Sequence, residues 1–242
     1  MASTQLHASL GRIKGERRLY TWAAAIAIAV VFFGFSRTYY LKGAFGTPEL
    51  STLKHIHGVL MTAWFVLFLT QVRLVATQRI AVHRQLGLLG VVLAAALVFV
   101  GTQLGIASAR SGMSPIPSVP PLVFLVMPMG EVVIFTTLFT SAVLLRRRSP
   151  WHKRLMVLAS LAMLTPAVAR LPFDFVRSGG PLAFFALTDL VILSCIAVDT
   201  ARNRRLHPAF AIGFVVVVVG QLGRLALSQT PAWNAFARWL VA

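Results

Sequence analysis

The 242-residue chain is 57% hydrophobic and only 12% charged, and its mean hydropathy is +0.79. This composition excludes a soluble domain with a wetted surface, so we expect lipid to surround most of the chain. The formal net charge is +17, but Lys and Arg form short clusters between apolar runs. That pattern argues against a nucleic-acid-binding stripe and predicts contact with the headgroups of anionic lipids.

Seven apolar runs follow one another along the chain, and each is long enough for a membrane-crossing helix of roughly 20 residues. They predict spans near 19–36, 52–76, 84–108, 120–145, 151–171, 182–201 and 208–228. We therefore expect an all-α integral membrane bundle of about seven transmembrane helices.

The segments around these runs suggest a topology. Residues 1–18 are polar and basic and are interpreted as a cytoplasmic tail, ahead of a seven-helix domain at 19–228 and an interfacial amphipathic segment at 229–242. The first apolar run is too long for a signal-peptide core and is read as a retained span. Most of the 23 Lys and Arg residues fall in segments on the same side of the membrane as the N-terminus. This bias predicts the N-terminus inside and the C-terminus outside a bacterial inner (plasma) membrane.

Three histidines follow basic loops on the predicted inner side: His83, His152 and His207. They share one depth on alternate helices, and Asp199 lies near the same end of its span. Three imidazoles with a carboxylate suit zinc or non-haem iron, whereas two imidazoles facing each other suit haem. The alternative is that these side chains place polar tips among lipid headgroups and bind nothing.

Two further histidines, His55 and His57, open the second span on the outer side. Residues two apart on a helix point roughly 200 degrees apart, so at most one of them faces inward. A helix of about 25 residues, or roughly 37 Å, separates His57 from His83. A cofactor set that uses both must therefore contain two sites.

Two carboxylates, Glu131 and Asp189, lie deeper in the apolar runs. Ionisable groups at such depth are costly and usually face the bundle interior or a wet cavity. They predict a proton relay, a ligand or a substrate anchor, or else protonated acids bonded to a neighbouring helix. Polar residues nearer the outer face predict a vestibule with His57: Gln103, Arg170, Asp174, Arg177, Gln221 and Arg224.

Common catalytic motifs are missing from the sequence. It has no phosphate-binding glycine loop, no Gly-x-Ser-x-Gly elbow, no His-Glu-x-x-His and no paired cysteines. Hydrolases and nucleotide-driven pumps of the usual kinds are therefore disfavoured.

Several stretches carry a family-like pattern: His57-Gly58 to Gly90, His152-Lys153-Arg154-Leu155-Met156, Pro166-Ala167 to Arg170, and Arg204-Arg205-Leu206-His207-Pro208-Ala209. In them the chain resembles a group of uncharacterised bacterial multi-pass membrane proteins, over most of residues 36–215. This resemblance implies a shared bundle and supplies no established activity.

A second pattern combines His57 and Leu60-Met61 with His83-Arg84-Gln85-Leu86-Gly87. It is similar to transmembrane b-type cytochromes of the ascorbate-reducible kind, in which histidine-bearing helices hold haem near both membrane faces. The resemblance implies histidine-ligated haem. The outer side has no evident second histidine on another helix, so the histidine count supports one inner haem.

Two functions follow as hypotheses. The leading one is a membrane redox protein that binds haem b or a transition metal through some of His57, His83, His152 and His207, with Asp199 as a further metal ligand. The alternative is a cofactor-free accessory subunit or proton-coupled carrier in which Glu131 and Asp189 line a path. The sequence does not decide whether the chain is an enzyme, and its expected partners are lipids and other membrane subunits.

Overall fold

The protein is almost entirely helical in the computed structural model, which describes residues 2–116 and 118–242 apart from the side chains of residues 2–14, 16 and 177. No strand occurs within this described part, which confirms the all-α fold class. The elements are α1 (Ala2–Phe35), η1 (Ser36–Tyr40), η2 (Lys42–Phe45), α2 (Thr52–Ala76), α3 (Ile80–Arg110), α4 (Pro121–Phe124), α5 (Val126–Leu144), α6 (Ser149–Ala162), α7 (Thr165–Val168), α8 (Asp174–Ser178), α9 (Gly180–Asn203), α10 (Pro208–Ser228) and α11 (Pro231–Val241).

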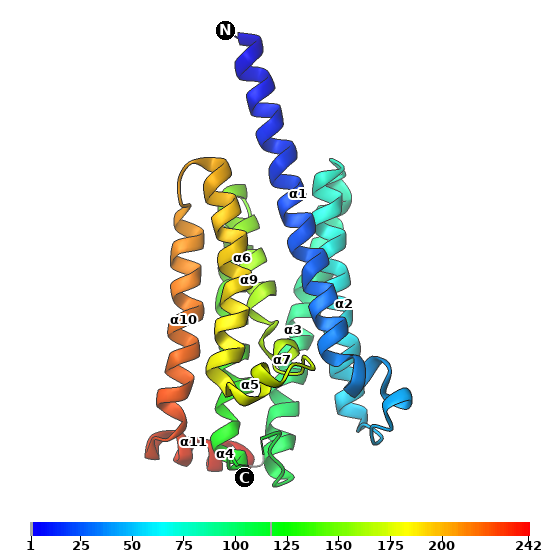
Figure 1. Cartoon of the computed structure of the whole chain (residues 1–242), viewed down its shortest axis with the longest axis vertical. Helices are drawn as coiled ribbons and strands as arrows, with labels where there is room; N and C mark the ends of the chain where they lie inside the picture. The colour runs from blue at the N-terminus through cyan, green and yellow to red at the C-terminus, as the bar shows by residue number, and fades with distance from the viewer. Residues whose placement is uncertain (1, 117) are drawn as a thin grey trace.

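Six helical stretches in the described residues are long and apolar enough to cross a membrane: Arg17–Tyr40, Thr52–Ala76, Ile80–Arg110, Pro121–Leu144, Gly180–Asn203 and Pro208–Ser228. They coincide with six of the seven predicted spans. Their length and composition support a multi-pass membrane protein. They stand side by side as a bundle (Figure 1).

The remaining predicted span, 151–171, is divided rather than continuous. Helix α6 ends at Ala162, and α7 begins at Thr165 after a turn. Pro166 explains the division, because its ring collides with the carbonyl four residues earlier, at Ala162, and it has no amide hydrogen to donate. The sequence pattern alone had predicted one helix across this position.

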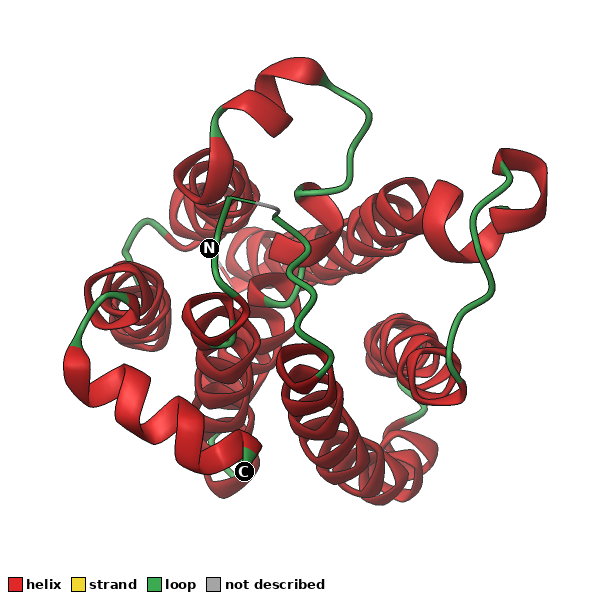
Figure 2. Ribbon diagram, turned by 90° about the horizontal axis from the view of Figure 1, so that it is seen from below, coloured by secondary structure: helices red, strands yellow, loops and turns green. Residues whose placement is uncertain are grey.

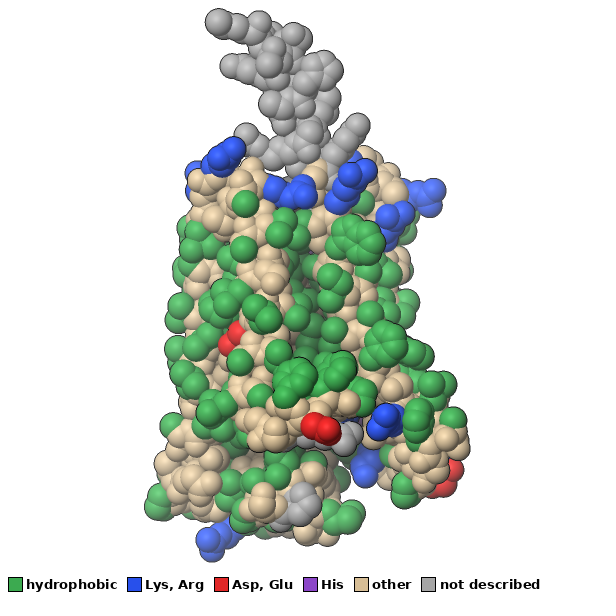
Figure 3. Space-filling view, in the orientation of Figure 1, with side chains coloured by type: hydrophobic (Ala, Val, Ile, Leu, Met, Phe, Trp, Pro, Cys, Tyr) green, Lys and Arg blue, Asp and Glu red, His purple; other side chains and the backbone are tan. Residues whose placement is uncertain are grey.

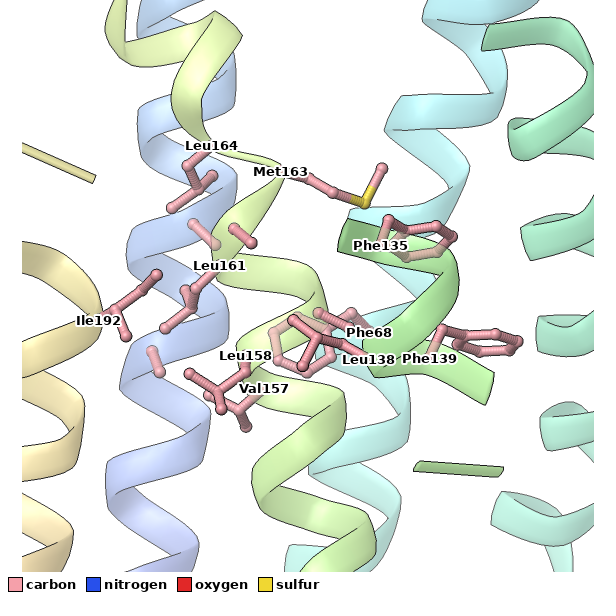
Figure 4. Packing of buried hydrophobic residues seen from close by; sticks show 14 of the residues in the cluster. Phe68, Phe135, Leu138, Phe139, Val157, Leu158, Leu161, Met163, Leu164 and Ile192 are labelled. Atoms are coloured by element: carbon pink, nitrogen blue, oxygen red, sulfur yellow. The ribbon is translucent and has the colours of Figure 1, made fainter. Parts of the chain in front are cut away.

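Helix α6 lies at the centre of the bundle, in contact with α1, α5, α9 and α10. Every residue from 157 to 162 is buried. Figure 4 shows Leu158 and Leu161 of α6 between the helices that carry Leu138 and Ile192. Because other helices cover it, α6 does not need the uniformly apolar surface of a lipid-facing span.

The basic loops gather at one end of the bundle. The turns after α2, α5 and α9 lie at the upper end in Figure 1, the end toward which α1 extends, and the C-terminus lies at the lower end. Arg17 ties α1 to the first of these turns by donating to the Ala76 carbonyl at 3.2 Å. On the face drawn in Figure 3, Lys and Arg crowd the upper end and hydrophobic side chains cover the middle.

Helix α11 lies across the opposite end, where Figure 2 shows it side-on while the long helices are seen end-on. Trp233 and Ala237 pack inward, and the indole N–H of Trp233 donates to the Leu122 carbonyl at 2.8 Å. Phe236 and Trp239 are exposed, at 46% and 71%. This two-sidedness is the amphipathic pattern expected of a helix in the membrane interface.

Candidate functional site

Asp199 is completely buried near the basic end of α9, and protein groups surround its carboxylate. Arg154 of α6 donates through Nε to Oδ2 at 3.0 Å and through Nη2 to Oδ1 at 3.0 Å and Oδ2 at 2.9 Å. Tyr20 of α1 donates its hydroxyl to Oδ1 at 2.9 Å. Both carboxylate oxygens are thus engaged by protein groups, and Asp199 joins three helices.

His83 and His152 do lie together at this end. The first opens α3, the second opens α6, and their ring centres are 6.4 Å apart. The Nδ1 atom of His152 is 2.8 Å from the Ala142 carbonyl oxygen, which fixes this nitrogen as the one that carries hydrogen in the neutral ring. The Nε2 atom of His152 is then left with a lone pair, the form in which imidazole binds metals.

His207 has a different role in the structure. Its Nδ1 accepts from the amide of Ala209 at 3.1 Å and so caps α10, and its ring lies 5.6 Å from that of Trp151. Partial burial, followed by the nearby charge of Arg154, lowers the pKa of His207 below its ordinary value. Among the described residues, no group of three or more His, Cys, Asp or Glu side chains is placed to hold a metal ion.

His57 lies near the other end of α2, beside α3. A Cβ atom at Gly101 would be 3.8 Å from its Cε1, and equally far from Val132. Its Nδ1 is buried and has no hydrogen-bond partner within the described part of the chain. The structure thus brings two of the four candidate histidines together and leaves His57 and His207 apart from them.

Glu131 on α5 pairs with Arg224 on α10, whose Nη1 donates to Oε2 at 2.7 Å. The same nitrogen donates to the Met127 carbonyl at 3.1 Å, and Nε donates to the Gly220 carbonyl at 3.2 Å. Gly130 makes room for this arrangement, because a Cβ there would collide with the Arg224 side chain. The deep carboxylate is therefore neutralised by a neighbouring helix.

The second deep acid, Asp189 on α9, accepts from the Gln221 amide at 3.0 Å. Gln221 and Arg224 are three residues apart and so lie on one face of α10. Both are buried, at 2% and 6% exposure. This face of α10 thus links Asp189 and Glu131 to one polar cluster across α5, α9 and α10.

The predicted outer vestibule is largely replaced by these pairs. Gln221 and Arg224 bond Asp189 and Glu131, while the Arg170 guanidinium lies 4.8 Å from the centre of the Phe35 ring. Gln103 and Asp174 are exposed, and the side chain of Arg177 lies outside the described residues.

Sequence reasoning missed the partners of the buried acids. The sequence pattern places Tyr20 in an apolar run and counts Arg154 among the basic residues of the predicted inner side. The sequence does contain one signal, which is charge balance. An acid such as Asp199 inside an apolar helix needs an opposite charge at the same depth, and Arg154 lies at that depth in its own span.

The two resemblances inferred from sequence motifs remain predictions. In comparisons with known proteins, no family model, curated protein or solved structure matches this chain.

Proposed function

We propose that the chain is a membrane redox protein in which His83 and His152 hold one haem b at the basic end of the bundle. The observation that carries this proposal is the approach of the two imidazoles from α3 and α6 to a centre separation of 6.4 Å. When bound, haem b supplies reversible one-electron transfer.

The spacing of the rings suits a single metal between them. With metal–nitrogen bonds of about 2 Å, two imidazoles on opposite sides of one ion have centres about 6 Å apart. The Ala142 carbonyl fixes the orientation of the His152 ring, as backbone carbonyls do for many histidine ligands. His83 and His152 would therefore be the residues that hold the haem iron.

The number of donors favours haem over an ion held by protein alone. Structural zinc takes four protein ligands, catalytic zinc three, and non-haem iron commonly two histidines with a carboxylate. Asp199 is bound to Arg154 and Tyr20, and His207 caps α10. Arg84 and Arg146 at the same end offer positive charge to haem carboxylates.

The test is a pair of visible spectra, oxidised and dithionite-reduced, of protein expressed with added haem precursor and purified in detergent, with iron analysis of the same sample. We expect a reduced b-type band and one iron per chain. His83→Ala and His152→Ala should each abolish the band, and the matched control His207→Ala should keep it. A featureless, iron-free wild type, or a band that survives both substitutions, would refute the proposal.

The same proposal includes a topology of seven crossings, with α6 and α7 together as the fifth, the N-terminus in the cytoplasm and the C-terminus outside an inner membrane. The clustering of basic turns at one end supports it, since such turns stay in the cytoplasm and meet anionic lipid there.

Single cysteines in a Cys195→Ala background test this topology with a membrane-impermeant maleimide on intact spheroplasts. Ser178→Cys, between α7 and α9, should react from outside, and Thr77→Cys, between α2 and α3, only after lysis. Labelling of Thr77→Cys in intact spheroplasts would show that the orientation is the opposite of the one proposed. Failure of Ser178→Cys to react until lysis would mean that α6 and α7 do not cross.

A second candidate function rests on the polar cluster of Glu131, Arg224, Asp189 and Gln221. Ionisable residues inside a membrane commonly mark a path for protons or a polar solute, which suits a carrier or a carrier subunit without cofactor. Glu131→Gln should then abolish proton-coupled uptake while Asp174→Asn, an exposed acid, leaves uptake intact. Equal uptake by the two variants would rule this function out.

A further inference from the structure

Four polar atoms along α2 and at the start of α3 are buried without a hydrogen-bond partner among the described residues: His57 Nδ1, Trp64 Nε1, Gln71 Oε1 and His83 Nδ1. The three on α2 are seven residues apart. Seven residues make almost two full turns, with a drift of about 20° per heptad, so the three side chains lie on one face of the helix. Each step along this face rises about 10 Å.

This face of α2 points into the packing between α2, α3 and α5. Gln71 approaches α3 at Gly87, where a Cβ would be 3.8 Å from its Nε2, and His57 approaches Gly101 at the same distance. Between them, Trp64 is only 3% exposed, with its ring 5.1 Å from Phe135. We call this strip, defined by His57, Trp64, Gln71 and His83, the α2 seam.

The polar atoms of the α2 seam need partners. A buried donor or acceptor without a hydrogen bond loses its hydration and gains nothing in return, and a membrane offers no bulk water to replace it. Buried groups left unpaired by protein are commonly bonded to internal water. A repeat of such atoms along one face therefore indicates a ligand, and water is the smallest that fits both donors and acceptors.

The donor and acceptor order along the seam is consistent with a water file. The Trp64 indole can only donate, whereas Gln71 Oε1 can only accept and His57 Nδ1 accepts in one neutral tautomer. Waters that accept from Trp64 can thus pass their own hydrogens on toward His57 in one direction and Gln71 in the other. The seam continues to His83, which lies beside the Gln71 backbone.

We propose that the α2 seam binds a file of internal water that runs from His57 past Trp64 and Gln71 to the His83 and His152 pair. The site takes water as its ligand and links the outer part of the bundle to the basic end. It does not depend on haem binding, because three of its four polar atoms belong to α2 and take no part in the proposed haem site, which adjoins the seam only at His83.

The indole hydrogens provide a direct test. In ¹⁵N-tryptophan-labelled protein, the Trp64 signal is assigned from a Trp64→Phe sample, and its exchange with water is compared with that of Trp233. Trp233 is a matched control, since it is also buried, at 6% exposure against 3% for Trp64, but donates to the Leu122 carbonyl. We expect the Trp64 hydrogen to exchange at least tenfold faster than that of Trp233.

A second variant ties the effect to the seam. Gln71→Met keeps the side-chain length but removes the acceptor, and it should slow Trp64 exchange severalfold, whereas Gln103→Met on an exposed position of α3 should leave it unchanged. Exchange of Trp64 as slow as that of Trp233 in the wild type would show a dry seam and overturn the inference. An unchanged Trp64 rate in folded Gln71→Met would equally overturn a continuous file.

Discussion

The two ion pairs inside the bundle are built differently. Asp199 is fully buried and engages Arg154 through both carboxylate oxygens, with Tyr20 as a second partner. Glu131 accepts from Arg224 through one oxygen, and its side chain is 15% exposed. Protein encloses the carboxylate of the first pair, which we call the closed pair. The second, which we call the open pair, is joined by a single charge-assisted hydrogen bond and is partly exposed.

This difference separates a pair that holds helices together from a pair whose carboxylate can exchange its partner. A carboxylate whose oxygens are both taken cannot bind a further ligand unless the helices that it joins come apart. A carboxylate with an accessible side can trade its partner for a proton or a solute at lower cost. We therefore assign the Arg154 and Asp199 pair to stability and regard Glu131 as the acid that is able to act.

Breaking the closed pair should have the largest effect. Asp199→Asn removes the carboxylate that Arg154 and Tyr20 share, and loss of one partner of a buried pair costs about 3–5 kcal/mol. We expect a large fall in the thermal midpoint in detergent, followed by tryptophan fluorescence. The double variant Arg154→Met, Asp199→Leu should recover most of the loss, and a double variant as unstable as Asp199→Asn would contradict this account.

Crowding the open pair should have a smaller effect. Gly130→Ala places a methyl group against the Arg224 side chain, and overpacking of this kind costs about 1–3 kcal/mol. Gly223→Ala is the matched control, because a Cβ there meets no atom within 4 Å. The thermal midpoint should fall for the first variant and stay or rise slightly for the second; equal midpoints would argue against close packing at Gly130.

His207, which lies near the closed pair, should make stability depend on pH. Burial and the charge of Arg154 lower the pKa of His207 in the folded protein below the ordinary 6.5. Below pH 6.5, His207 binds a proton more readily in the unfolded chain than in the folded chain. The free energy of unfolding therefore has its full value above this pH and declines as the pH falls.

We expect a modest decrease in the thermal midpoint between pH 7.5 and 5.5. His207→Asn should reduce the decrease, because Asn can cap a helix but does not titrate in this range. An identical pH dependence in this variant would mean that other groups cause it.

A third ion pair, on the surface, should matter least. Lys42 and Glu49 are 2.6 Å apart, but the Glu49 side chain is 89% exposed. Lys42 lowers the pKa of this carboxyl through a hydrogen bond, yet water and salt screen such pairs. Glu49→Gln should leave the thermal midpoint unchanged within error, and a clear shift would show that the loop after α1 is coupled to the bundle.

Much of the fold was predictable because the bilayer imposes a simple rule on composition. Apolar length identified six helical spans, and the boundaries of α2 and α10 follow directly from charges and prolines. The division between α6 and α7 was less accessible. Its cause, Pro166, is visible in the sequence, but a proline inside an apolar run often kinks a membrane helix without ending it.

The candidate site was only partly predictable, because periodicity gives depth but not adjacency. Depth alone placed His83, His152 and His207 at one level. Only the packing of α3 on α5 and α6 on α10 decides that the first two meet and that His207 turns to its own helix. The partner of Glu131 was likewise hidden, since Arg224 follows it by 93 residues.

The enclosed position of α6 has a consequence for biosynthesis. A segment that carries His152, Lys153 and Arg154 in its first turns is a poor candidate to leave the translocon into lipid by itself. The short turn from α5 favours insertion of the two as a hairpin, and the bonds from Arg154 to Asp199 can form only after α9 has been made. Maturation of this protein thus depends on a helix made later in translation, and a chain truncated before α9 should be held by membrane quality control.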